Sequence, residues 1–186
     1  MTLTKTPVCD FGKKAEDFKL KSIDNKLLSL NDIRGEKATL VMFICNHCPY
    51  VKAIIKDLAK DCNDLGNDGV NTVAIMSNDS KNYPEDSFDN MMIFAKNNEF
   101  KKINYLIDET QAVAKKYKAV CTPDFFGYNK NLELQYRGRI RELKNLKPVR
   151  TGDSDLFIAM KQIAETSKGP ETQIPSAGCS IKWLVN

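Results

Sequence analysis

The sequence predicts an α/β domain in which a central mixed sheet carries helices on both faces. Two apolar runs, at residues 38–45 and 70–76, are nearly continuous, as is typical of strands that are covered on both sides. Each run is followed by a segment whose apolar residues recur at helical spacing, and strands that alternate with helices favour a sheet with parallel strands. Two short runs at 125–128 and 132–136, joined by a polar turn, add an antiparallel hairpin that makes the sheet mixed.

Length and composition are those of one domain. The chain has 186 residues, and 42% of them are hydrophobic, which is enough to bury a core without disulfide staples. We expect a single domain over residues 1–186, with residues 1–14 as an N-terminal arm and residues 168–186 as a C-terminal tail. The formal net charge of +4 is too weak to indicate nucleic-acid binding.

The sequence contains no feature of a membrane protein. No apolar run approaches the length of a membrane span, and residues 1–12 lack the apolar core of a signal peptide. We therefore expect a cytoplasmic protein with no membrane partner. In a reducing compartment the six cysteines are not expected to form a structural disulfide framework. They are expected to be catalytic, metal-binding or simply buried.

The expected elements follow in order along the chain. A small N-terminal hairpin comes first, with short apolar runs at 18–20 and 27–30 on either side of a turn. The remaining elements are strands at 38–45, 70–76, 104–107, 125–128 and 132–136, and helices at 50–65, 88–95 (an insertion), from 108 onward, and at 153–166. Two helix ends rest on single residues. Gly66 is expected as a C′ residue, and Asp108 with Gln111 has capping-box spacing.

The junction between the first buried strand and the first long helix reads Cys45-Asn46-His47-Cys48-Pro49. Two cysteines at this spacing, between a strand and a helix, are typical of a redox-active dithiol. The helix N-terminus presents unpaired N–H groups and a partial positive charge, and both stabilise a thiolate. We expect Cys45 to be the exposed attacking thiolate and Cys48, one turn further in, to resolve the mixed disulfide.

Pro49 leaves the start of this helix open. Proline is easiest at the first helical position, which would make Cys48 the N-cap and leave Cys45 in the preceding loop. If the helix starts at Cys45 instead, Pro49 removes one backbone bond in the first turn. The first geometry favours a reactive Cys48 and the second a reactive Cys45. We favour Cys45, because the two-cysteine pattern is intact.

Three further residues are candidates for the same site. His47 is the only histidine, and an imidazolium here would stabilise the Cys45 thiolate and make the couple more oxidising. The alternative is a histidine that only caps the helix or faces solvent. Thr122-Pro123 precedes the strand at 125–128, and its peptide bond can be cis. If it is cis, we expect the loop to pack against the two cysteines, with the Thr122 backbone free to pair with a substrate strand.

The other cysteines and one arginine complete the candidates. Cys121 and Cys179 are candidate accessory redox thiols, although each can also be a docked or buried side chain. Cys62 falls on the apolar face of its helix and is expected in the core, and Cys9 lies in the arm without a visible partner. Arg139 could lower the pKa of a nearby thiolate or orient a peroxide, and the alternative is a solvated strand end.

Four segments together resemble one family. They are 43–52 around the two cysteines, 117–126 around Thr122-Pro123, 136–140 around Arg139, and 175–183 around Cys179. The two cysteines, the strand before them, Thr122-Pro123 and the closing hairpin look like the thioredoxin superfamily over roughly residues 12–167. The four segments together resemble the bacterial peroxiredoxin-like group of the alkyl hydroperoxide reductase/thiol-specific antioxidant (AhpC/TSA, or redoxin) class, and that match also covers the tail. The resemblance implies a thioredoxin-like fold with an N-terminal hairpin extension and an inserted helix.

The resemblance also implies roles for individual residues. Thioredoxins place the nucleophile at the position of Cys45, the resolving thiol at Cys48 and a cis-proline at Pro123. Peroxiredoxins place the peroxidatic cysteine directly before a proline, which matches Cys48-Pro49. They also carry a proline and a threonine upstream, where this sequence has Val41 and Cys45. The hydroxyl that would hold a peroxide is therefore replaced by a thiol.

The sequence leads to an oxidoreductase hypothesis with two alternatives. The first function is a thiol–disulfide oxidoreductase that uses the Cys45–Cys48 couple. One alternative is a thiol peroxidase with peroxidatic Cys48, resolved by Cys45 or Cys179. The other is a Cu or Zn protein that binds the metal through Cys45, Cys48 and His47, with Cys121 as a further candidate ligand. No nicotinamide or flavin fingerprint is present, so we expect no cofactor, and no resident metal. Electrons are expected from thioredoxin-type proteins or glutathione-type small thiols, and the oligomeric state stays open.

Overall fold

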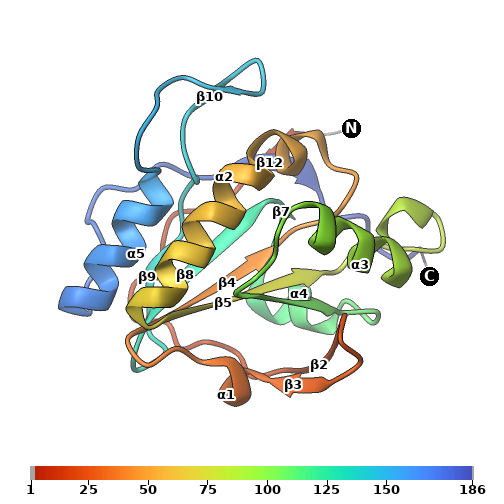
Figure 1. Ribbon diagram of the computed structural model, residues 1–186, viewed down its shortest axis with the longest axis horizontal. Helices are drawn as coiled ribbons and strands as arrows, with labels where there is room; N and C mark the ends of the chain where they lie inside the picture. The colour runs from red at the N-terminus through yellow and green to blue at the C-terminus, as the bar shows by residue number, and fades with distance from the viewer. Residues whose placement is uncertain (1–2, 186) are drawn as a thin grey trace.

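A computed structural model describes residues 3–185 and places a seven-stranded mixed sheet at the centre of the molecule (Figure 1). The strand order across this sheet is β3-β2-β6-β5-β4-β8-β9. The strands are β2 (Lys19–Ser22), β3 (Leu27–Ser29), β4 (Ala38–Phe43), β5 (Val70–Met76), β6 (Ile103–Ile107), β8 (Asp124–Asn129) and β9 (Leu134–Tyr136). β4, β5 and β6 run parallel, and β2 and β8 join them antiparallel. The predicted α/β class and mixed sheet are confirmed.

Helices cover both faces of the sheet. One face carries α2 (Pro49–Leu65), α3 (Phe88–Asn97) and α5 (Asp155–Thr166), and the other carries α1 (Leu30–Ile33) and α4 (Ala112–Tyr117). Side chains of β4 alternate between the two cores, with Leu40 and Met42 facing α2 and Val41 and Phe43 facing α4. All six residues of β4 are buried, which explains why its sequence is continuously apolar.

The end of α2 differs from the sequence prediction. Gly66 keeps a right-handed conformation, with φ −61°, and the chain continues into the 3-10 turn Gly66–Asp68. Gly69 has the positive φ, 82°, that lets the chain leave the helix. Gly66 is therefore not the C′ residue, because the extra turn moves the left-handed position to Gly69.

The helix α4 starts later than the capping-box spacing predicts. The carboxylate of Asp108 accepts hydrogen bonds from the Ser77 hydroxyl at 3.0 Å and from the Ala114 N–H at 2.9 Å. Gln111 is left-handed, with φ 62°, and its amide donates to the carbonyl oxygens of Ser77 and Lys182. The predicted capping box is wrong, because both side chains tie this loop to neighbouring segments instead of to each other.

The arm and the tail form a three-stranded antiparallel sheet. In it β12 (Ala177–Ser180) lies between β1 (Leu3–Lys5) and β7 (Cys121–Thr122). Beyond the strands, the Thr6 N–H donates to the Ser176 carbonyl at 2.9 Å, and the Ser176 N–H donates to Thr6 Oγ1 at 3.0 Å. The tail is thereby held against residues 121–122, next to the start of β8.

A short hairpin protrudes from the body of the protein. It consists of β10 (Leu143–Lys144) and β11 (Lys147–Pro148), and it forms the loop at the top of Figure 1. Its residues from Lys144 to Arg150 are all exposed. Among the described residues, no helix is both long enough and apolar enough to cross a membrane.

Candidate active site

The turn between β4 and α2 contains both cysteines of the predicted couple. β4 ends at Phe43 and α2 begins at Pro49. Cys48 is the N-cap, with φ −62° and ψ 124°, and Pro49 occupies the first helical position, where its missing N–H costs no helical bond. Of the two helix starts that Pro49 allows, the structure has the one that favours a reactive Cys48.

Both sulfurs are enclosed. Cys45 is 1% exposed and Cys48 is 0% exposed. The Cys45 sulfur lies 3.3 Å from Thr122 Oγ1, and the neutral Cys48 thiol donates to the Thr122 carbonyl oxygen at 3.2 Å. The expectation of an exposed Cys45 is therefore wrong, because the loop before Pro123 and the tail cover the turn.

Hydrogen bonds among thiols give the two cysteines opposite ionisation. A hydrogen bond from the Cys45 thiol lowers the pKa of Cys48 from 9.0 to about 5; burial opposes this shift, and a further bond from Cys179 supports it. The bond to Cys48, together with burial and the negative charge of Asp86, raises the pKa of Cys45 well above its usual value. When Cys48 is ionised it has no proton to donate to the Thr122 carbonyl oxygen, and its sulfur instead accepts hydrogen bonds from the thiols of Cys45 and Cys179. The reduced pair then carries its charge on Cys48 and its proton on Cys45.

Asp86 is a site residue that the sequence analysis missed. It is fully buried at the end of a 3-10 turn, Pro84–Asp86. Its Oδ1 accepts from the N–H groups of Asn46 at 2.8 Å and His47 at 3.3 Å, and its Oδ2 accepts from Asn78 Nδ2 at 2.8 Å. These bonds hold the turn between the cysteines. No local signal marks Asp86, because its partner His47 is 39 positions away in the chain.

His47 is directed at Asp86. Its Nδ1 lies 2.7 Å from Asp86 Oδ2, and its ring stacks on Tyr83 with 5.5 Å between centroids and 8° between planes. Atoms of Cys45, His47 and Asp86 that could bind a metal lie within 4.8 Å of one another. A cation there would have to replace the bond between His47 and Asp86 and the existing contacts of the Cys45 thiol. The arrangement is already complete as a hydrogen-bonded network.

The Thr122-Pro123 peptide bond is cis, and the loop packs against both cysteines through Thr122. The Thr122 backbone is not free for a substrate strand, because β12 pairs with it and Cys179 is its partner in register. A Cβ on Gly178 would lie 2.1 Å from the Thr122 carbonyl oxygen, so glycine is required for this close approach. The expectation of an open strand edge at Thr122 is therefore wrong.

The remaining candidates divide into those near the sulfurs and those elsewhere. Cys179 is 2% exposed and hydrogen-bonds with Cys48. Cys121 is buried in β7, with its thiol directed at the Pro123 carbonyl at 3.5 Å, and burial raises its pKa. Cys62 is in the core, as expected, and Cys9 is half-buried. Arg139 does not serve the thiolates, because its ion pairs are with carboxylates, those of Asp155 at 2.8 Å and Glu142 at 3.7 Å.

Solved structures resemble this chain over nearly its whole length. An uncharacterized conserved protein from Geobacillus kaustophilus is 39% identical with a TM-score of 0.94, covering 100% of this chain and 98% of that one. A hypothetical protein from Sinorhizobium meliloti 1021 is 35% identical with a TM-score of 0.90, covering 98% and 100%. A putative thioredoxin from Neisseria meningitidis, at 20% identity and a TM-score of 0.60, covers 83% and 89%; it shows the fold alone. No curated protein matches the chain.

The fold and the family agree with the resemblance found in the sequence. The neighbours confirm the thioredoxin-like fold. The pattern of the AhpC/TSA family matches residues 11–143, which is well over half of the chain and includes both cysteines and the cis-proline. The chain therefore belongs to the AhpC/TSA family and is a thioredoxin-like oxidoreductase.

Proposed function

We propose that the protein is a thiol–disulfide oxidoreductase in which Cys48 attacks and Cys45 completes the exchange. The position of Cys48 at the N-cap of α2, directly before Pro49, carries this proposal, and the lowered pKa of Cys48 and raised pKa of Cys45 agree with it. The roles are the reverse of those expected from the sequence, since Cys48 is the residue at the helix N-cap.

The exchange takes two steps. The Cys48 thiolate attacks one sulfur of a substrate disulfide, forms a mixed disulfide with it and releases the other substrate sulfur as a thiolate. Cys45 then loses its proton and attacks the Cys48 sulfur. The Cys45–Cys48 disulfide forms, and the second substrate sulfur leaves and takes up a proton. The substrate gains two electrons and the dithiol loses two, which a reducing dithiol or two thiols later return.

The environment of Cys45 favours this order of events. Its pKa is raised first of all by the hydrogen bond to Cys48, and then by burial and Asp86. Once Cys48 is in a mixed disulfide it no longer carries a negative charge, so the largest of these effects is removed. Cys45 therefore ionises more easily at the step that needs it. In this proposal Thr122, His47 and Asp86 are positioning residues.

The tail controls access to the couple. Because neither sulfur is exposed, β12 has to move away from Thr122 before a substrate sulfur can reach Cys48. When β12 is in place, Cys179 donates a hydrogen bond that stabilises the Cys48 thiolate. We assign Cys179 this supporting role. In this proposal the arm and the tail, of which the structure describes residues 3–14 and 168–185, are appendages of a single domain, and the tail is the one that acts on the site.

The electron donor is a reducing dithiol protein or a small thiol. The dithiol provides the redox chemistry without a bound cofactor, and six free cysteines suit a reducing compartment such as the cytoplasm. Comparison of reduction by a thioredoxin system and by reduced glutathione would identify the donor class, and cell fractionation would test the compartment.

Single-cysteine variants test the proposal. Reduced protein is mixed with a peptide disulfide, and the adducts are mapped by mass spectrometry. Cys45→Ser is expected to accumulate the mixed disulfide on Cys48, whereas Cys48→Ser forms no adduct and reduces no substrate. Cys9→Ser is the matched control and retains full activity. An adduct on Cys45 in the Cys48→Ser variant, with turnover retained, would reassign the attacking sulfur.

A thiol peroxidase is the second candidate, because the ionised cysteine directly precedes Pro49. The Cys48 thiolate would attack one peroxide oxygen, break the O–O bond and become a sulfenic acid, while the other oxygen leaves as water. The Cys45 thiol would then condense with it, forming the disulfide and a second water. Stopped-flow oxidation by hydrogen peroxide separates the candidates. A rate constant no greater than that of free cysteine excludes the peroxidase.

A further inference from the structure

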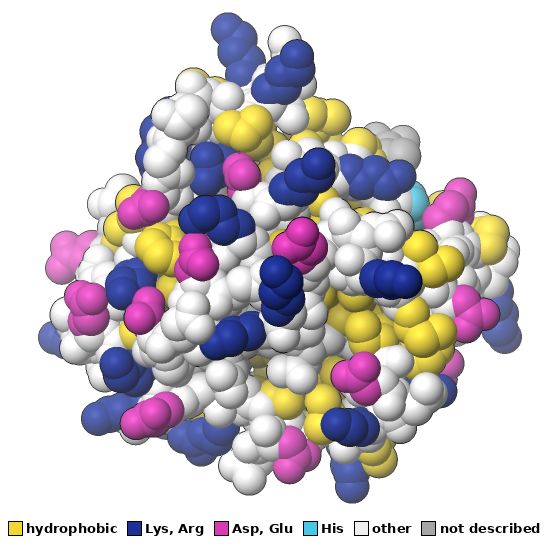
Figure 2. Space-filling view, in the orientation of Figure 1, with side chains coloured by type: hydrophobic (Ala, Val, Ile, Leu, Met, Phe, Trp, Pro, Cys, Tyr) yellow, Lys and Arg dark blue, Asp and Glu magenta, His cyan; other side chains and the backbone are white. Residues whose placement is uncertain are grey.

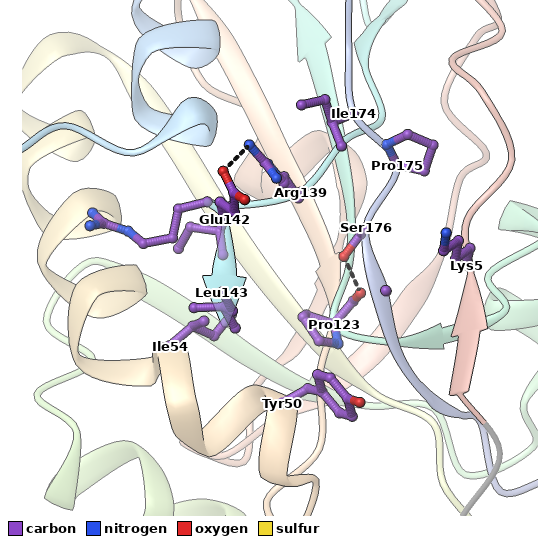
Figure 3. A pocket seen from close by; sticks show the side chains of 13 residues that line it. Lys5, Tyr50, Ile54, Pro123, Arg139, Glu142, Leu143, Ile174, Pro175 and Ser176 are labelled. Atoms are coloured by element: carbon purple, nitrogen blue, oxygen red, sulfur yellow. Dashed lines mark hydrogen bonds and ion pairs between the residues drawn. The ribbon is translucent and has the colours of Figure 1, made fainter. Parts of the chain in front are cut away.

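A cavity of about 430 Å³ lies next to the cysteine turn, on the far side of Pro123. Its floor includes Pro123, which follows the residue that contacts both sulfurs, and Tyr50, which is two positions after Cys48. Figure 3 shows these two side chains together on one side of the space. A molecule held here is therefore next to the segments that position the reactive sulfur.

The walls of the cavity combine an apolar side with separate donors. Ile54 of α2 and Leu143 of β10 form the apolar side, opposite the tail residues that precede β12 (Figure 3). The donors are Lys5 Nζ of β1 and the Tyr50 hydroxyl, and among the described residues neither has a hydrogen bond or an ion pair. Tyr50 is half-buried, so its hydroxyl is a group that a polar ligand can satisfy, whereas Lys5 is exposed and offers a positive charge at the edge of the cavity.

The charge around the cavity is predominantly positive. Lys5, Arg139 and Arg141 line it together with a single carboxylate, Glu142. Arg139 is paired with Asp155 and Glu142, and Arg141 with Asp57. Among the described residues that line the cavity, Lys5 is therefore the cation without an ion pair. The neighbouring hairpin adds exposed Lys144, Lys147 and Arg150, and Figure 2 shows Lys and Arg side chains over the protruding top of the molecule. Positive potential of this kind attracts anions toward the opening.

We propose that this cavity binds the body of a small disulfide that carries carboxylate groups. The apolar or aromatic part of the molecule packs against Ile54 and Leu143, and a carboxylate binds Lys5 and the Tyr50 hydroxyl. The volume suits a low-molecular-weight compound rather than a protein domain. The same compound touches Ser176, whose hydroxyl donates to the Pro123 carbonyl at 2.9 Å, so it contacts the part of the tail that must move.

The proposal rests on the proposed function, since the bound compound is the one that Cys48 attacks. Two aromatic disulfides of similar size separate the effect of charge from that of the apolar body. Dithiobis(nitrobenzoate) carries two carboxylates, and 4,4′-dithiodipyridine carries none. Second-order rate constants for both are measured at low ionic strength in a Cys9→Ser background, with mass spectrometry to confirm that Cys48 is the sulfur modified.

We expect Lys5→Gln to lower the rate constant for the carboxylated reagent about fivefold, which is the effect of losing one exposed charge contact. The rate constant for dithiodipyridine, which has no carboxylate, is expected to stay unchanged. Lys60→Gln, which removes an exposed lysine on the other end of α2, is the matched control and is expected to change neither. Leu143→Ala is expected to slow both reagents by a similar factor, because both use the apolar wall.

Two results would overturn the proposal. One is that Lys5→Gln changes the rate constants of both reagents equally, or changes neither. That result would mean that the carboxylate of the reagent does not bind Lys5, and it would leave the proposed thiol exchange intact. The other is failure of either reagent to modify Cys48 in the parent protein. That result removes the proposed function as well, so the two failures are distinguishable.

Discussion

Replacing Cys45 by alanine removes the hydrogen bond that contributes most to the low pKa of Cys48. The shift from 9.0 to about 5 corresponds to roughly 5 kcal/mol of preference for thiolate over thiol, at about 1.4 kcal/mol per pKa unit. In the variant the bond from Cys179 remains, and burial still opposes ionisation. We therefore expect the pKa of Cys48 to rise by more than about 2 units, toward or above the ordinary range of a thiol.

The rate of exchange at pH 7 is a poorer readout of this change than the titration midpoint. A thiol with a pKa of about 5 has about a hundredfold more thiolate at pH 7 than one at 9.0. The intrinsic nucleophilicity of a thiolate falls with its pKa, with a Brønsted coefficient of about 0.4–0.5, so the same shift lowers it by roughly sixtyfold. The two effects nearly cancel. The low pKa therefore acts mainly by making Cys48 a good leaving group and the couple more oxidising.

The assay is alkylation by iodoacetamide between pH 4 and 10, with mass-spectrometric quantification of the peptide that contains Cys48. The parent protein is expected to show a midpoint near pH 5, and Cys45→Ala a midpoint displaced upward. Cys9→Ser is the control, and its midpoint should match the parent. A midpoint near 9 in the parent, or an unchanged midpoint in Cys45→Ala, would refute the assignment of Cys48 as the thiolate held by Cys45.

Three further predictions concern the same site. Asp86→Asn removes a negative charge that raises the pKa of Cys45. In a Cys48→Ser background, the pH midpoint for alkylation of Cys45 should therefore fall. An unchanged or higher midpoint would contradict this prediction. Ser176→Ala removes the hydrogen bond of 2.9 Å from the Ser176 hydroxyl to the Pro123 carbonyl oxygen, which we expect to contribute about 1 kcal/mol to the docking of the tail. Alkylation of Cys48 at fixed pH should therefore become about fivefold faster. An unchanged rate would show that this bond does not hold the tail. The pKa of Cys48 is lowered in the folded state, so its contribution to the stability of the reduced protein is complete above pH 9 and is lost as the pH falls toward about 5. Urea unfolding of reduced protein at several pH values should show this dependence in the parent, and Cys48→Ala should lack it.

The elements that the sequence predicts well are those whose signals are local. The β4 and α2 patterns depend on burial along one strand and one helical face, and both were confirmed within a few residues. Pro49 leaves two starts for α2 open in the sequence, and the structure has the one that places proline at the first helical position. For the attacking sulfur the two local signals disagree, because the cysteine spacing favours Cys45 and the backbone constraint at Pro49 favours Cys48, which is the sulfur that the proposed function uses.

The parts that the sequence does not reveal depend on contacts between distant segments. Asp86 lies in a polar loop and gains its role only when that loop folds against the turn at His47. The sheet formed by β1, β12 and β7 consists of strands of two to four residues, which are too short to show an alternating pattern. Gln111 shows the opposite problem, because a plausible local cap was overridden by bonds to the C-terminal segment.

The position of β12 changes how the reactivity of this dithiol should be understood. In the proposed mechanism β12 and a substrate compete for the strand edge of Thr122, so each exchange includes the free energy needed to displace the tail. Cys179 leaves Cys48 in the same movement, and the thiolate loses one of its two thiol donors as it becomes accessible. Opening therefore exposes a sulfur that is more nucleophilic than the enclosed one, because its pKa is higher. In this mechanism the closed form stabilises the charge and the open form uses it, so we expect the docking of the tail, rather than the acidity of Cys48, to set the rate.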